Sequence, residues 1–147
     1  MQVKAIIHEK YTETEIHVCD HEVNQNLQKL VEDISSFVNL GLTVQRQNGD
    51  KMVLHEKDVI SFFSQGQKVF ARTENETYIV AKKLYELEQD LNKELFFRIS
   101  KSEIINLKRI RKLDMSLSGT IKVIMKDDSE TYTSRRNVAR LKKVLGL

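Results

Sequence analysis

The sequence has 147 residues, enough for one domain with at most a small appendage. Hydrophobic residues make up 40% of the chain and charged residues 31%, which permits a folded core and excludes disordered and collagen-like proteins. No apolar run approaches the roughly 18 residues of a membrane span, no signal-peptide pattern follows Met1, and the single cysteine cannot form an internal disulfide, so we expect a cytoplasmic protein.

The net charge of +3 is the sum of three segments with different charges. Residues 1–40 carry three lysines against seven acidic residues, a net charge of −4. Residues 41–97 carry eight basic and nine acidic residues, and residues 98–147 carry thirteen basic against five acidic ones, which gives −1 and +8. The basic last third predicts a surface that binds a polyanion, although charge alone does not distinguish DNA, RNA, an acidic protein and a solvated surface.

The first forty residues predict a small unit of two strands and one helix. The strands are expected at residues 3–7 and 15–19, where β-branched residues are frequent. A helix over residues 24–37, ended by Gly41, has one apolar face formed by Leu27, Leu30, Val31, Ile34 and Phe37. A unit this small rarely stands alone, so we expect this face to pack on the rest of the chain or on a second copy.

Short strands about ten residues apart dominate residues 41–147, a spacing typical of an all-β or mainly β domain. Two strands, at residues 42–46 and 52–54, flank the hairpin signal Asn48-Gly49. Further strands are predicted at residues 59–63, 69–72, 77–80, 96–99, 107–113, 120–125 and 130–133. Helices are predicted at residues 81–91 and 134–145, with Ser134 as the N-cap of the second.

Enzymatic and metal chemistry finds little support. If residues 15–21 were fully extended, His17, Cys19 and His21 would share one face and could form a thiol or three-ligand metal site. A helix starting near His21 would break that alignment, and the five glycines are too dispersed for a phosphate-binding loop. We therefore expect no enzyme activity, catalytic residue, metal, cofactor or small-molecule substrate.

Two polar clusters in the basic third carry groups suited to nucleic acids. The first runs from Phe96 to Asn106 and ends an apolar strand in a polar loop, and the second is Ser134-Arg135-Arg136-Asn137-Val138 at the start of the last helix. Arginine can bind guanine through two hydrogen bonds, and hydroxyl and backbone N–H groups bind phosphate. Either cluster alone is more typical of a solvated charged surface.

Together, in this order and behind a run of short strands, the clusters resemble the LytTR family, the all-β DNA-binding domain of many bacterial response regulators and stand-alone transcription factors. The resemblance covers residues 42–147. It rests on Phe97-Arg98-x-x-x-Ser102-x-x-Ile105-Asn106, on the helix with Leu84, Leu87 and Leu91, and on Ser134-Arg135-Arg136 before a short helix. The sequence departs from the family at Ser100, where the family has histidine, and at Glu103, where it has an aromatic residue.

The resemblance implies a domain of about ten short strands in small sheets with short helices, whose strand-end loops enter successive major grooves of double-stranded DNA, usually at direct repeats. By position in the motifs, the implied base contacts are Arg136, Lys101 and Gln67. Arginine and lysine donate to guanine O6 and N7, and glutamine pairs with adenine. The implied phosphate contacts are Ser102, Lys108, Arg135, Lys142 and Lys68.

These expectations describe a sequence-specific transcriptional regulator without an attached receiver domain, which residues 1–40 are too few to form. Residues 1–40 would form a homodimer, complete the core, or dock a regulator. The resemblance to stand-alone family members implies that such a regulator would be a membrane-protein inhibitor encoded nearby. The alternative is a protein–protein interaction module with a basic face and only generic DNA affinity. A small metal- or thiol-dependent enzyme built around His17, Cys19 and His21 is the third hypothesis.

Overall fold

The computed structural model describes residue 18, residues 25–39 and residues 41–147. The chain divides into two units, residues 1–38 and 39–147, and each is described by itself. Helix α1 spans Gln25–Asn39, which confirms the predicted helix, and belongs to the first unit except for its last residue. Along α1, Leu27, Leu30 and Ile34 are half-buried, and Val31 is 43% exposed. The strands predicted at residues 3–7 and 15–19 lie outside the described residues except for Val18.

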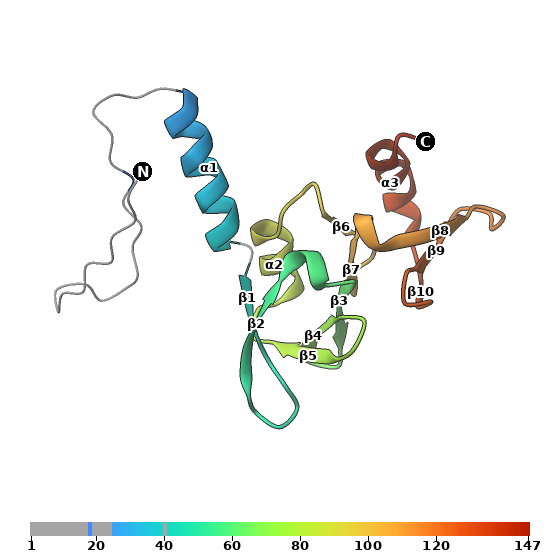
Figure 1. Ribbon diagram of the computed structural model, residues 1–147. Helices are drawn as coiled ribbons and strands as arrows, with labels where there is room; N and C mark the ends of the chain where they lie inside the picture. The colour runs from blue at the N-terminus through green and yellow to red at the C-terminus, as the bar shows by residue number, and fades with distance from the viewer. Residues whose placement is uncertain (1–17, 19–24, 40) are drawn as a thin grey trace. The chain divides into compact units, whose positions relative to one another are not determined.

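The second unit is built on a sheet of seven antiparallel strands in the order β2-β1-β5-β4-β3-β7-β6 (Figure 1). The strands are β1 (Gly41–Gln45), β2 (Lys51–His55), β3 (Ser61–Gln65), β4 (Lys68–Arg72), β5 (Thr77–Val80), β6 (Phe96–Arg98) and β7 (Glu103–Asn106). A 3-10 turn, η1 (Glu56–Asp58), precedes β3, and α2 (Leu84–Asp90) connects β5 to β6.

A second, three-stranded antiparallel sheet has the order β10-β9-β8, with β8 at Ile110–Asp114, β9 at Lys122–Met125 and β10 at Glu130–Tyr132. A 3-10 turn, η2 (Leu107–Arg109), joins the two sheets. Another, η3 (Arg135–Asn137), leads from β10 into the last helix, α3 (Val138–Leu145). Ten strands in two sheets, with short helices, confirm the predicted mainly β fold within residues 41–147.

The core is divided between the two faces of the seven-stranded sheet, because successive residues of a strand point to opposite faces. On one face, Phe62, Phe96 and Ile104 belong to a buried cluster that includes Leu84 and Leu87 of α2.

On the other face, the neighbouring residues Phe97 and Ile105 belong to a second cluster with Val123 and Met125 of β9 and Leu141 of α3. Strands β6 and β7 are therefore enclosed between α2 on one face and the small sheet with α3 on the other. This sandwich fixes the loop that joins β6 to β7.

The sequence patterns missed β7. Its residues Ile104, Ile105 and Asn106 are all buried, so the strand lacks the alternation of apolar and polar residues that marks a half-exposed strand. The predicted hairpin at Asn48-Gly49 is confirmed between β1 and β2, with Gly49 at a φ of +98°.

The starts of both predicted helices of the second unit differ from expectation. The first begins at Leu84 rather than at residue 81, where a Glu86 carboxylate oxygen accepts a hydrogen bond from Lys83 N at 2.7 Å. In the second, α3 begins only at Val138, after η3. Ser134 occupies the N-cap position of η3, but the prediction that it caps α3 is wrong, because its buried side-chain oxygen has no hydrogen-bond partner. Its backbone N–H donates to Ile99 O and its backbone carbonyl accepts from Asn137 N.

Candidate nucleic-acid interface

The structure brings together the three segments that carry Gln67, Lys101 and Arg136. These are the β3–β4 turn (residues 66–67), the β6–β7 loop (residues 99–102) and the η3 segment (residues 134–137). Ser64 N, next to the first segment, donates a hydrogen bond to Ser102 O at 2.9 Å, and Ser134 N donates to Ile99 O at 2.9 Å. The β6–β7 loop is therefore bonded to both neighbours and lies between them.

The β3–β4 turn is a tight hairpin connection. Gln65 pairs with Lys68, so only Gly66 and Gln67 form the turn, and Gly66 has a φ of +61° that suits glycine. The side chains of Gln67 and Lys68 are exposed. Gln67 therefore stands at the tip of a short hairpin, as expected for a residue that reaches outward.

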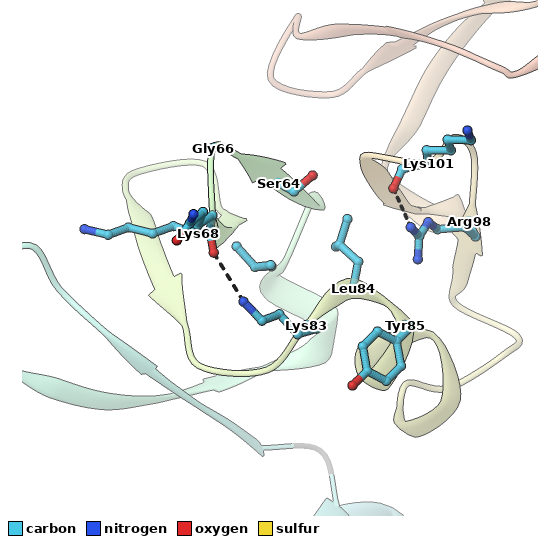
Figure 2. Close-up of a pocket in the computed structure, with 10 residues that line it drawn as sticks. Ser64, Gly66, Lys68, Lys83, Leu84, Tyr85, Arg98 and Lys101 are labelled. Carbon is cyan, nitrogen blue, oxygen red and sulfur yellow. Dashed lines mark hydrogen bonds between the residues drawn. The ribbon is translucent and has the colours of Figure 1, made fainter.

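The side chain of Arg98 holds the β6–β7 loop in place by hydrogen bonds to the loop carbonyls. Its Nε donates to Ser100 O at 2.6 Å, and its guanidinium also donates to Lys101 O (Figure 2). The same guanidinium makes an ion pair with Glu88 of α2 at 3.3 Å. Because the loop carbonyls are directed toward Arg98, the Lys101 side chain is left exposed.

The two departures from the family signature have structural roles. Ser100 Oγ accepts a hydrogen bond from Ser102 N at 3.2 Å and lies 3.3 Å from Ser102 Oγ, so it closes the loop that carries Lys101. The carboxylate of Glu103 accepts a hydrogen bond from Thr131 Oγ1 at 2.5 Å, which links β7 to β10.

Asn137 fixes the η3 segment against the β6–β7 loop. This side chain is buried, and its Nδ2 lies 3.1 Å from Arg98 O and 3.4 Å from Ile99 O. Arg136 immediately precedes it and is exposed. Sequence reasoning assigned no role to Asn137, since a polar residue at a helix start is read as a surface residue unless its tertiary partner is known.

The basic residues fall into two groups by their partners. Six make ion pairs with described carboxylates: Arg46, Lys82, Arg98, Arg109, Arg111 and Lys122. Six of the predicted DNA contacts are cations with no described carboxylate within 4.0 Å: Lys68, Lys101, Lys108, Arg135, Arg136 and Lys142. The positive charge of these six side chains has no ion-pair partner within the described part of the chain.

Lys108 is not brought together with the other predicted contacts. It lies in η2, beyond the C-terminal end of β7, whereas the β6–β7 loop precedes the N-terminal end of that strand. The buried Asn106 fixes this opposite end, because its Nδ2 donates to Val59 O at 2.8 Å and its Oδ1 accepts from Lys108 N at 3.0 Å. The signature asparagine thus has a structural role.

The residues of the proposed metal or thiol site, His17, Cys19 and His21, lie outside the described residues. Within the described ranges, no group of three or more His, Cys, Asp or Glu side chains is arranged to hold a metal ion. Among the helices of these ranges, none is long and apolar enough to cross a membrane.

Comparisons of the sequence with known proteins show which family the chain resembles. Residues 50–146 match the LytTr DNA-binding domain family. The chain is 31% identical over 147 residues to an uncharacterised HTH-type transcriptional regulator of Staphylococcus aureus strain NCTC 8325, covering 100% of this chain and 99% of that protein. A regulator with the same description from strain N315 has the same identity and coverage.

A solved structure shows the same fold. The LytTr DNA-binding domain of a putative methyl-accepting/DNA response regulator from Bacillus cereus superposes with a TM-score of 0.69 and 21% identity, covering 73% of this chain and 97% of that chain. Residues 25–39 and 41–147 contain no two consecutive α-helices joined by a short turn, the arrangement of a helix-turn-helix. With the family match covering most of the chain, the protein belongs to the LytTR family of DNA-binding domains.

Proposed function

We propose that this protein is a sequence-specific regulator of transcription that binds double-stranded DNA in the bacterial cytoplasm. The observation that carries the proposal is the pair of backbone hydrogen bonds, Ser64 N to Ser102 O and Ser134 N to Ile99 O, which place the three exposed segments side by side. Segments held by backbone bonds keep a fixed spacing, as reading bases in a groove requires.

In this proposal Arg136, Lys101 and Gln67 contact bases from the three adjacent segments. Arg136 and Lys101 donate to guanine O6 and N7, and Gln67 pairs with adenine N6 and N7. All three side chains are exposed, and no described carboxylate lies within 4.0 Å of either cation. A free cation can exchange its hydration for a base without first breaking an ion pair.

Phosphate contacts orient the domain without reading sequence. We assign this role to Ser102, Arg135, Lys142 and Lys68, all of which are exposed. Lys108 lies at the opposite end of β7, so in this arrangement it would reach only DNA that extends well past the three segments.

The remaining parts of the proposal concern the wider assembly. The loops would enter successive major grooves, with one protomer of a homodimer on each of two direct repeats. The half-buried and exposed apolar residues of α1, Val31 among them, suit self-association or docking of a membrane-protein inhibitor. The −4 charge of residues 1–40 would keep that segment off the DNA.

Selection of bound duplexes from a random pool tests the function directly. We expect enrichment of direct repeats, followed by a loss of about 1–3 kcal/mol in binding for Arg136→Ala and relaxed preference at one base position. Arg111→Ala is the matched control, because it removes the same charge from an arginine already paired with Asp128 at 2.5 Å. A pool without enrichment, or equal effects of the two variants, would support the interaction module with generic DNA affinity instead.

A further inference from the structure

A hollow of about 340 Å³ adjoins the proposed base contacts, between the β3–β4 turn, the start of α2 and the β6–β7 loop. Gln67 and Lys101 line it from the two loops, and Lys83 and Tyr85 line it from the α2 side. The complete set of lining residues contains no aspartate or glutamate. The chemistry of this hollow therefore favours an anion.

Lys83 is one of four cations that line the hollow, with Lys68, Arg98 and Lys101. Its Nζ lies 3.4 Å from Gln67 O, and Figure 2 shows this ammonium turned toward the β3–β4 turn. The side chains of Lys68 and Lys101 extend outward on either side in the same view. Among the described residues no carboxylate lies within 4.0 Å of Lys83 Nζ, since Glu86 binds the backbone N–H of Lys83 instead. At least two of its three N–H donors remain available.

The neighbouring Lys82 offers a contrast one residue away. Its Nζ makes an ion pair with Asp90, the last residue of α2, at 2.6 Å, and it does not line the hollow. Two adjacent lysines of equal charge therefore differ in both partner and direction.

We propose that the Lys83 ammonium binds a phosphate of the DNA backbone, so that the contact with the duplex extends from the β3–β4 turn to the start of α2. This inference rests on the proposed function. The major groove of B-DNA is about 12 Å wide, so a base-reading residue at its centre has backbone phosphates about 6 Å away on each side. A lysine bound to the main chain of Gln67 is within reach of one of them if Gln67 contacts a base.

Salt dependence gives the expected size of the effect. Each phosphate contact adds about 0.9 to the slope of log affinity against log salt concentration. Loss of one contact should therefore reduce the slope by about 0.9, which corresponds to roughly eightfold weaker binding at 0.1 M salt.

The test compares Lys83→Ala, Lys83→Gln and Lys82→Ala in the full chain, on the duplex enriched from a random pool and on a scrambled duplex. We expect both Lys83 variants to bind both duplexes about eightfold more weakly with the shallower salt slope, and Lys82→Ala to bind as the wild type does. Glutamine keeps a donor for Gln67 O but no charge, so a matching loss in Lys83→Gln assigns the effect to the charge.

Three results would overturn the inference. Lys83→Ala could equal Lys82→Ala. The loss could be confined to the enriched duplex with an unchanged salt slope, which would mean that Lys83 only positions Gln67. Inorganic phosphate could bind in a calorimetric titration and lose that binding in Lys83→Ala while DNA affinity stays constant, which would make the hollow a site for a free anion. Wild-type protein that prefers no duplex would refute the proposed function itself.

Discussion

Replacing Asn137 by alanine separates the stability of the domain from the placement of the three segments proposed to contact DNA. The variant loses the side-chain bonds to Arg98 O and Ile99 O, at 3.1 and 3.4 Å. Ile99 O keeps its bond from Ser134 N, so the main cost is one buried carbonyl without its partner. We expect the free energy of unfolding to fall by about 1–2 kcal/mol.

Asn106→Ala is the matched control, because this second buried asparagine also bonds a backbone carbonyl through its side chain. Its Nδ2 lies 2.8 Å from Val59 O, and its Oδ1 accepts from Lys108 N at 3.0 Å, so two good bonds are lost. The expected cost, about 2–3 kcal/mol, is at least as large as for Asn137→Ala. These bonds lie at the end of β7 away from the three segments.

We expect Asn137→Ala, the variant that loses less stability, to lose more affinity for DNA than Asn106→Ala. Without Asn137, the η3 segment loses its side-chain link to the β6–β7 loop, and the variant can lose up to the value of one base contact, about 1–3 kcal/mol in binding. Asn106→Ala should bind DNA as the wild type does, provided that both variants remain folded.

Denaturant unfolding followed by fluorescence anisotropy with the enriched duplex measures both quantities. If Asn137→Ala is destabilised but binds DNA with wild-type affinity, the idea that its side chain positions Arg136 is refuted. If Asn106→Ala weakens DNA binding more, the surface around Lys108 belongs to the interface.

Three further predictions concern the core, a buried carboxyl and α1. Leu87 is fully buried beneath α2, so Leu87→Ala should lower the free energy of unfolding by about 2–5 kcal/mol in denaturant titrations, and a loss below 1 kcal/mol would contradict this packing. Burial raises the pKa of the Glu56 carboxyl above its ordinary 4.5, and this effect outweighs the lowering of the pKa by the bond from Asn92 N. The fold therefore favours the protonated carboxyl. The contribution of Glu56 to stability is present below pH 4.5 and is lost as the pH rises through the folded pKa. Glu56→Gln should therefore melt at a higher temperature than the wild type at pH 7, with a smaller difference at pH 4, and equal melting temperatures at pH 7 would contradict the burial argument. If α1 mediates the proposed homodimer, Val31→Asp should shift sedimentation toward the monomer, whereas unchanged sedimentation would place the dimer contact elsewhere.

Local patterns in the sequence were sufficient for most strands and failed where burial hides periodicity. Strand β3 and the β1–β2 hairpin carry ordinary signals, whereas β7 is buried on both faces and resembles a continuation of the preceding loop. The Ser134 cap failed because tertiary contacts decide the chain path there, with Ser134 N bonded to Ile99 O, 35 positions earlier in the chain.

The proximity of the candidate contacts could not be predicted from the residues alone. Ser64 and Ser102 meet because β3 pairs with β7, across a crossover that omits β4, β5 and β6 in chain order. The resemblance to the family implied which residues contact DNA, and the structure shows which of these share one end of the sheet. Lys108 is assigned to the same surface from its position in the sequence, whereas the structure places it in η2, at the other end of β7.

The signature residues explain why the exposed positions can vary. Phe97 and Ile105 fill the second core, Arg98 bonds the carbonyls of the β6–β7 loop, and Asn106 anchors the far end of β7. None of these four side chains is exposed. They set the position of the loop, while Lys101 at its tip is free of packing and can change identity without disturbing the fold. A Lys101 substitution should therefore change which DNA sequence is bound while leaving the stability of the domain nearly constant, which is the behaviour expected when one scaffold serves different operators.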